Sequence, residues 1–540
     1  MAIREMKTLL LSLLLFIFVV GCSNNEEANQ SEEVPEATTN PEDVGYPDEI
    51  TYWTELHPSV ANSLEDLNGV GVYQELEKAT GTKVSFQHPS GEGTQITEQF
   101  NLLIASGNLP DVIEYNWHAV QRGPDNAIDS GTIIRLNELI EAHAPNLSKY
   151  LEENPEVKKS ITTDGGNIYA FPFLRSDEKL MVFMGPIIRQ DWLDKLNLEM
   201  PTTIDEWENV LRTIKDGDPN GNGEKDEIPL LLHPDQFKNL GAFASAWGMT
   251  PMFYHENGTV KFGSIQPEYK EFLSRMNSWY EDGLLDADFA ATDLKLQDAK
   301  VTNNQLGSLY GYTGGGIGKY TGLMADKNPE FKLAPAPNPS LKEGEKAARG
   351  HRDFPYSGWH SVAITGNAEN PEEIVKWLDY AYSEEGHFLF NFGVEGVSYE
   401  VEDGYPKYTD EVMENPDGLP VSDALGKYVR SSYGGPFIQD VRYLEQYLEL
   451  PEQKDAIQIW SDSAENEILL PLITLTAEES REYASIMSDL ETYYDEMVVK
   501  FIMGAEPLEN FDKFVETLKG MGIERAIELQ QAALERYEQR

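Results

Sequence analysis

The fold of this 540-residue chain is decided by the stretch that begins with Ile50-Thr51-Tyr52-Trp53 and ends with Asp111-Val112-Ile113-Glu114-Tyr115. Both runs read as short strands, and residues 82–86 alternate like a third strand between them. Helices are predicted over residues 72–80 and 95–106, where a glycine follows each pattern. Strands that alternate with helices imply a parallel sheet with crossover helices.

The order of strand and helix returns further along the chain. Met181-Val182-Phe183-Met184 is predicted to begin a second series, and a helix over residues 190–196 follows it. The next helix runs to about Lys215, with Thr203 as its cap and Glu206 as the partner in a capping box. Further helices are expected at residues 268–282, 371–384, 477–504 and 510–539, the last with a break near Gly520.

The length of the chain requires more than one core. About 490 residues remain after the amino-terminal segments, which is too many for a single hydrophobic core. Ile168-Tyr169-Ala170-Phe171-Pro172-Phe173 is a candidate crossover between two lobes. We therefore expect an α/β chain in which lobe 1 contains residues 48–171 and 332–395, and lobe 2 contains residues 172–331 and 396–540.

The amino terminus has the pattern of a secretory signal peptide over residues 1–21. Arg4 and Lys7 precede an apolar run that is shorter than the ~20 residues of a spanning helix. Cys22 is the only cysteine and follows a small residue, an arrangement that resembles the bacterial lipobox; the alternative is an inert cysteine. Residues 22–47 are acidic and poor in apolar residues, which predicts a disordered tether. We expect a lipid anchor at Cys22 and a protein on the extracellular face of the cell membrane.

The charge of the chain excludes two classes of partner. The formal net charge is −51, from 93 acidic and 42 basic residues. Nucleic-acid binding needs a basic footprint, and electrostatic docking on anionic lipids needs basic segments, so neither is expected. The single cysteine also excludes an internal disulfide.

A loop dense in oxygen ligands follows the helix that ends near Lys215, and it reads Asp216-Gly217-Asp218-Pro219-Asn220-Gly221-Asn222-Gly223-Glu224-Lys225-Asp226-Glu227. Hard cations such as calcium take six to eight oxygen ligands, and alternate residues here supply them. In one register Asp216 comes first and Gly221 makes the turn; in the other Asp218 comes first and Gly223 makes it. The alternative is an acidic surface turn that holds no metal.

Several of these stretches together resemble the family-1 extracellular solute-binding lipoproteins of ABC importers, in the LplA/LipO-like subgroup related to the alginate-oligosaccharide binding proteins. They are Asp191-Trp192-Leu193-Asp194-Lys195-Leu196, Pro201-Thr202-Thr203, Asp218-Pro219-Asn220-Gly221-Asn222-Gly223, Asp226-Glu227-Ile228-Pro229 and Asn391-Phe392-Gly393-Val394-Glu395-Gly396-Val397. The resemblance implies a two-lobed, periplasmic-binding-protein-like type II fold with a hinge, a sugar-like ligand in the cleft, and a membrane permease as partner of a monomer. It also implies a structural calcium ion, bound in the second register of the loop. In the separate sugar site, Glu395 is a candidate ligand-binding residue. The implied calcium ligands are Asp218, Asn220, Asn222, Asp226, Glu227 and the main-chain carbonyl of Glu224.

A sugar site needs aromatic platforms with polar groups between them. Six aromatic residues fall at predicted strand ends or in glycine-flanked loops: Trp53, Trp117, Trp247, Tyr310, Tyr312 and Trp359. We expect at least half of them to line the cleft, with Arg352 near Trp359 as a polar partner. Trp192 and Trp207 stand at apolar helix positions and are expected in the core.

Motifs of catalysis are missing from the sequence. Residues 313–319 lack the first glycine of a phosphate-binding loop, and Tyr320 replaces its Ser or Thr. No Gly-x-Ser-x-Gly or His-Glu-x-x-His motif is present. The lipobox, the two strand-helix series, the aromatic set and the family resemblance together lead us to predict a carbohydrate-binding protein that catalyses no reaction. The alternatives are a surface-anchored polysaccharide hydrolase or lyase, and a sensory or adhesive surface protein.

Overall fold

The computed structural model describes residues 44–91, 93–430 and 434–540. The predicted signal peptide, Cys22 and the predicted tether up to residue 43 lie outside the described residues. The end of that tether is described and packs against helix α14 (Pro371–Asp379). There the Lys376 ammonium donates a hydrogen bond to the Val44 carbonyl and lies 5.2 Å from the centre of the Tyr46 ring.

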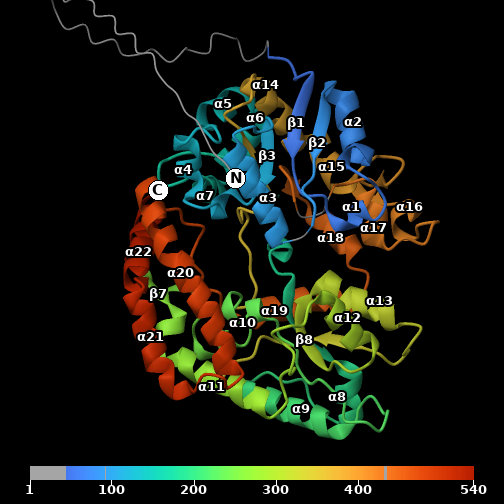
Figure 1. Ribbon diagram of the computed structural model, residues 1–540. Coiled ribbons are helices and arrows are strands. Elements are labelled where there is room, and N and C mark those ends of the chain that lie inside the picture. Colours follow the sequence, from blue (N-terminus) through green and yellow to red (C-terminus); the bar gives the residue numbers. More distant parts are fainter. Residues whose placement is uncertain (1–43, 92, 431–433) are drawn as a thin grey trace, which may run out of the picture. The chain divides into compact units, whose positions relative to one another are not determined.

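A four-stranded sheet with the order β10-β3-β1-β2 lies at the centre of the first of two large cores, which we call lobe 1 (Figure 1). Its strands are β1 (Glu49–Trp53), β2 (Lys83–Gln87), β3 (Val112–Tyr115) and β10 (Ser361–Ile364). Strand β1 pairs in parallel with both β2 and β3, which confirms the predicted parallel sheet, whereas β10 pairs antiparallel with β3. The carboxyl ends of three strands and the amino end of β10 therefore meet at one edge.

Helices complete the core of lobe 1. They are α1 (Pro58–Ala61), α2 (Gly71–Thr80), α3 (Thr94–Ser106), α4 (Gly123–Asp129), α5 (Asn137–His143), α6 (Pro145–Glu153), α7 (Pro155–Ile161), α14 and α15 (Glu384–Phe392). Helices α2 and α3 match the predicted ranges to within one residue, and each ends at a glycine with positive φ, Gly81 at 78° and Gly107 at 67°. That left-handed cap satisfies the last carbonyls and favours glycine.

Lobe 2 surrounds a second core and contains a three-stranded antiparallel sheet with the order β8-β5-β9. Its strands are β5 (Met184–Arg189), β8 (Ser308–Tyr312) and β9 (Leu333–Pro335). A separate two-stranded sheet in the same lobe is the hairpin of β6 (Phe253–Glu256) and β7 (Thr259–Phe262). The strand predicted at residues 181–184 is wrong in its bounds, because β5 begins only at Met184. Gly185 and Pro186, which are depleted in strands, hid the buried run that follows.

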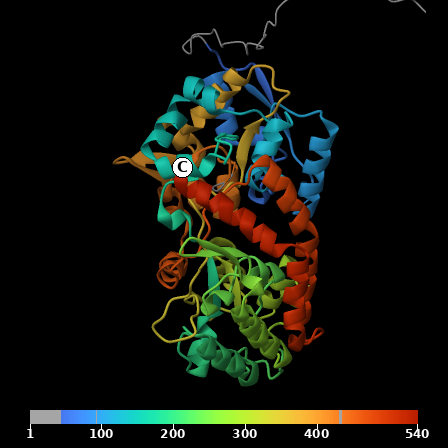
Figure 2. The same cartoon turned by 90° about the vertical axis from the view of Figure 1, so that its left-hand side faces the viewer.

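The helices of lobe 2 include the longest of the described chain. They are α8 (Gln190–Leu196), α9 (Ile204–Gly217), α10 (Pro234–Lys238), α11 (Pro267–Glu281), α12 (Leu294–Thr302), α13 (Lys319–Met324), α19 (Pro451–Asp462), α20 (Ala477–Ile502), α21 (Phe511–Gly520) and α22 (Ile523–Gln539). The predicted capping box is present, since Thr203 Oγ1 accepts the Glu206 N–H at 3.2 Å and Glu206 Oε2 accepts the Thr203 N–H at 3.1 Å. The predicted break near Gly520 separates α21 from α22 (Figure 2).

A smaller core joins the remaining elements, which are β11 (Tyr399–Glu402), β12 (Tyr405–Tyr408), α16 (Asp410–Met413), α17 (Val421–Gly426) and α18 (Val441–Tyr447). Backbone hydrogen bonds from Gly71 and Val72 to the carbonyls of Lys427 and Tyr428 tie this group to lobe 1. They favour assigning it to lobe 1, although the predicted boundaries place it in lobe 2. The short strands β4 (Leu174–Arg175) and β13 (Ile438–Gln439) pair in parallel next to the predicted crossover.

Candidate ligand-binding site

The carboxyl edge of the lobe 1 sheet carries a cavity of about 250 Å³, which we call the tryptophan cavity. Trp53 at the end of β1, Glu114 in β3, and Trp359 and His360 just before β10 line it. Open α/β sheets bind ligands outside the carboxyl ends of their strands. This position makes the cavity the first candidate for the site.

Trp359 is the most exposed tryptophan of the chain. Its side chain is 58% exposed, whereas the other eight tryptophans are at most 9% exposed. Gly358 before it has a φ of 81°, and a Cβ at that position would lie 2.7 Å from the Cβ of His118. Glycine at position 358 thus lets the backbone pass close to His118, while the indole that follows stays in solvent.

A buried ion pair lies under the tryptophan cavity. Arg430 donates from its two Nη atoms to both Glu114 oxygens at 2.6 and 2.9 Å, and the two side chains are 4% and 0% exposed. Tyr52 donates to Glu114 Oε2 at 2.8 Å, and His360 Nδ1 lies 3.3 Å from Oε1. Burial opposes the charged carboxylate, but Arg430 and His360 outweigh it and lower the pKa of Glu114 to about 2. The cavity therefore has a fixed, charged floor.

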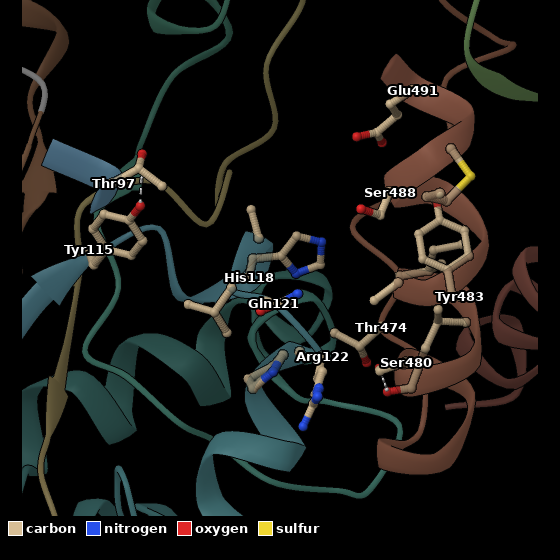
Figure 3. A pocket seen from close by; sticks show the side chains of 18 of the residues that line it. Thr97, Tyr115, His118, Gln121, Arg122, Thr474, Ser480, Tyr483, Ser488 and Glu491 are labelled. Carbon is tan, nitrogen blue, oxygen red and sulfur yellow. Dashed lines mark hydrogen bonds between the residues drawn. The ribbon is translucent and has the colours of Figure 1, made fainter. Parts of the chain in front are cut away.

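A larger cavity of about 630 Å³, which we call the α20 cavity, adjoins the first one (Figure 3). The two share Thr97, Tyr115 and Ala119 as lining residues. One wall comes from lobe 1 and includes His118 and the segment up to α4, and the other wall is a face of α20. Side chains from the two cores therefore meet across this cavity.

The edge of the lobe 2 sheet carries a third cavity of about 350 Å³, which we call the Tyr312 cavity. Tyr312 ends β8, is 52% exposed, and stacks on Phe183 with ring centres 6.2 Å apart and planes 8° apart. Arg175 also lines it and forms an ion pair with Asp353 at 2.9 Å. Burial and two nearby arginines lower the pKa of His351, beside Phe183, to about 3, so this imidazole is neutral at pH 7.

The structure brings three of the six aromatic residues to these sheet edges, namely Trp53, Trp359 and Tyr312. Trp117 is 1% exposed and donates to the Ile113 carbonyl at 3.0 Å inside lobe 1, and Tyr310 is 4% exposed, with a pKa raised by burial. Trp247 lies at a separate hollow beside α11.

Two further predicted site residues lie at the surface. Arg352 faces Glu178 at 3.5 Å, and Glu395 is exposed in the turn before β11. The ligand-binding roles of the eight residues stay predictions. Trp192 and Trp207 are fully buried, as expected.

Sequence reasoning missed several residues of these cavities. Glu114 carried a signal, because a carboxylate inside an apolar strand needs a partner. Its partner Arg430 is 316 positions away in the sequence and carried none. His118 and Phe183 likewise have no local pattern that separates them from ordinary loop residues.

The loop after α9 curls around its own polar side chains. Asp218 adopts a φ of 48° and accepts the backbone N–H of Asn222 at 3.1 Å. Asp226 Oδ1 accepts the side-chain amides of Asn220 and Asn222 at 3.0 and 2.9 Å. The side chains named in the second register are thus gathered on one side of the turn.

Glu227 is the feature of this loop that fits a cation. Both of its carboxylate oxygens are buried and have no hydrogen-bond partner among the described residues. Burial, with the charges of Asp226 and Asp218, raises its pKa. An unpaired buried carboxylate is costly, and a hard cation would satisfy it. In the described part of the chain, no group of three or more His, Cys, Asp or Glu side chains is arranged to hold a metal ion.

The sequence profile of the family described as bacterial extracellular solute-binding protein matches residues 68–387, more than half of the chain. The chain belongs to this family. Its members bind solutes, so the prediction of a solute-binding protein that is not an enzyme is confirmed. In the described part of the chain, no helix has the length and apolar character that a membrane crossing needs.

Three relatives cover most of the chain. The fructooligosaccharide ABC transporter substrate-binding protein FusA of Streptococcus pneumoniae serotype 4 (strain ATCC BAA-334 / TIGR4) is 27% identical over 499 residues and 88% of each chain. Lipoprotein LipO of Bacillus subtilis (strain 168) is 24% identical over 97% of each chain. The polygalacturonan/rhamnogalacturonan-binding protein YtcQ of the same strain is 25% identical over 84% of this chain and 86% of its own.

Solved structures confirm the two-lobed, periplasmic-binding-protein-like α/β fold. The alginate-binding protein AlgQ2, solved without calcium ion, superposes with a TM-score of 0.75 at 27% identity, over 91% of this chain and 98% of its own. S. pneumoniae FusA in complex with kestose gives a TM-score of 0.72 at 25% identity, over 91% and 99%.

Proposed function

We propose that this protein is the substrate-binding protein of an ABC importer, that it binds an oligosaccharide between its lobes, and that it delivers this sugar to a membrane permease. Relatives named for fructooligosaccharides, polygalacturonan and alginate support a carbohydrate ligand. As in other two-lobed binding proteins, closure about the hinge would present the permease with a defined shape.

The exposure of Trp359 is the observation that carries this proposal. A chain that buries eight of its nine tryptophans leaves this one in solvent at the ligand-binding edge of a sheet. An exposed indole offers a flat apolar platform for the face of a sugar ring. The ion pair of Glu114 and Arg430 below it supplies polar groups next to this platform, and the half-exposed Tyr312 is a second aromatic candidate in the separate Tyr312 cavity of lobe 2.

Calorimetry with a panel of neutral and uronic oligosaccharides tests the proposal. We expect at least one of them to bind, and Trp359→Ala to weaken that binding by about 2 kcal/mol, or roughly 30-fold in Kd. Leu294→Ala is the matched control, because Leu294 is 67% exposed on α12 and lines none of the cavities described. Binding that Trp359→Ala leaves unchanged would place the ligand elsewhere.

The lipid anchor is a further part of the proposal. Cys22 behind the apolar run, and the similarity to lipoprotein LipO over 97% of each chain, support acylation at this residue. We infer a protein held at the extracellular face of the membrane by residues 22–47 and working as a monomer. Metabolic labelling with a fatty acid should mark the chain, and Cys22→Ser should abolish the label.

Calcium is the metal that fits the loop after α9. The ion would be held by Asp218, Asn220, Asn222, Asp226, Glu227 and the carbonyl of Glu224, and the unpaired oxygens of Glu227 support it. The ion would balance three carboxylates at the end of α9 and so stabilise lobe 2. That AlgQ2 was solved expressly without calcium supports the same cation in a relative.

A further inference from the structure

We propose that the α20 cavity is a second part of the ligand groove, which binds the sugar units of a longer oligosaccharide that extend beyond Trp359. The inference rests on the proposed function, because it assumes that a sugar binds at the tryptophan cavity. It adds that the protein selects its ligand by chain length, and that α20 makes this selection.

The two cavities are direct neighbours. Thr97, Tyr115 and Ala119 line both of them. His118 lines the α20 cavity and packs against Gly358, the residue before the exposed indole. A chain of sugar rings that starts on Trp359 would therefore meet the α20 cavity next, on the far side of Tyr115.

The volumes favour a ligand that uses both cavities. The tryptophan cavity, at about 250 Å³, lies just below the range of roughly 300–1,000 Å³ that is typical of small-molecule sites. The α20 cavity, at about 630 Å³, lies well inside that range. The first cavity alone suits a small sugar, whereas the two together suit an oligosaccharide.

The walls of the α20 cavity combine aromatic rings and a neutral imidazole with the side chains of Arg122 and Glu491, all of which can contact a sugar. Tyr115 and Tyr483 present aromatic rings from opposite walls. Burial lowers the pKa of His118 to about 4, so its ring, which lines the cavity, is neutral at pH 7. A neutral imidazole can donate or accept a hydrogen bond with a sugar hydroxyl without binding an ion.

Helix α20 adds polar side chains that are still available. Ser488 and Glu491 point from α20 toward His118 across the cavity (Figure 3). Within the described part of the chain, neither side chain forms a hydrogen bond or an ion pair. Ser480, Ala484 and Ser488 are four positions apart and lie on one face of the helix. Their side chains are small, which leaves room in the cavity beside this face.

The test uses calorimetry with size ladders of fructo-, galacturono- and malto-oligosaccharides, from disaccharides to hexasaccharides. Ser488→Trp fills the cavity from an exposed position, and Ser485→Trp is its control, an exposed serine on the same helix that does not line the cavity. We expect the wild-type protein to bind hexasaccharides at least about tenfold more tightly than disaccharides. Ser488→Trp should remove that advantage and leave disaccharide binding unchanged, and Ser485→Trp should bind like the wild type.

The remaining outcomes separate the two proposals. Wild-type affinity that does not rise with ligand length, or a length advantage that survives Ser488→Trp, would overturn the second part of the groove and leave the proposed function intact. An equal loss for short and long ligands would also overturn it, because the bulky indole would then hinder closure of the lobes. A wild-type protein that binds no member of any ladder would overturn the proposed function itself.

Discussion

Replacing Arg430 by methionine should destabilise the protein strongly, because the change leaves Glu114 as a buried carboxylate without its partner. The guanidinium makes two hydrogen bonds to that carboxylate, at 2.6 and 2.9 Å, and Glu114 is 0% exposed. Removing one partner of a buried ion pair costs about 3–5 kcal/mol. The pKa of Glu114 is lowered although its burial acts in the opposite direction, so Arg430 and His360 together stabilise the carboxylate by more than its desolvation costs.

Urea unfolding followed by circular dichroism measures this cost. At pH 7 we expect Arg430→Met to lose about 3 kcal/mol, and the double variant Arg430→Met with Glu114→Gln to recover part of that loss, since no charge is then left unpaired. Arg481→Met is the control, an exposed arginine on α20 whose loss should change stability by less than about 0.5 kcal/mol.

The pH dependence gives an independent check of the same pair. Glu114 has a lowered pKa in the folded protein, so its contribution is complete above about pH 4.5 and is lost as the pH falls toward 2. In Arg430→Met, burial still raises the pKa of Glu114 and only the weaker contacts with His360 and Tyr52 oppose it, so protonation relieves the variant. The stability difference should therefore shrink on acidification. A difference below about 1 kcal/mol at pH 7, or one that grows toward pH 4, would refute this reasoning.

Three further predictions concern other parts of the chain. Gly185→Ala should lower stability by about 2 kcal/mol in urea unfolding, because the new Cβ would lie 2.5 Å from the Trp460 ring; Gly322→Ala, with nothing within 4 Å, should not. Asp164→Ala should cost about 2 kcal/mol, because Arg536 of α22 and Arg540 just after it lose their charged acceptor; a loss that high salt does not reduce would argue against an ionic origin. EDTA should lower the Tm of the wild type, and Asp226→Ala should remove that response. If EDTA does not change the Tm and elemental analysis finds no bound metal, the loop is a simple turn.

Local sequence signals predicted the elements of this fold well. The capping box at Thr203, the glycines after α2 and α3 and the break at Gly520 each act within a few residues, so the sequence contains the whole cause. The predicted bounds of strand β5 were wrong because tertiary burial overrides the low strand propensity of Gly185 and Pro186. The antiparallel pairing of lobe 2 likewise depends on distant partners.

The candidate site was less predictable than the fold. Trp117 and Trp359 both flank strands of one sheet, yet one indole is buried at 1% and the other is 58% exposed. The exposure of each indole depends on the residues that pack over it, and these residues are far away in the sequence. The pairing of Glu114 with Arg430 joins positions 316 apart for the same reason.

The uneven burial of the tryptophans has an optical consequence. The wavelength of indole fluorescence depends on the polarity around the ring. The eight buried tryptophans therefore emit at shorter wavelengths, and the solvent-exposed Trp359 contributes the emission at longer wavelengths. A solute that settles on this ring would change its spectrum and protect it from acrylamide quenching. On the proposed binding mode, the chain thus contains its own intrinsic reporter of occupancy, and titrations can be followed without any attached dye.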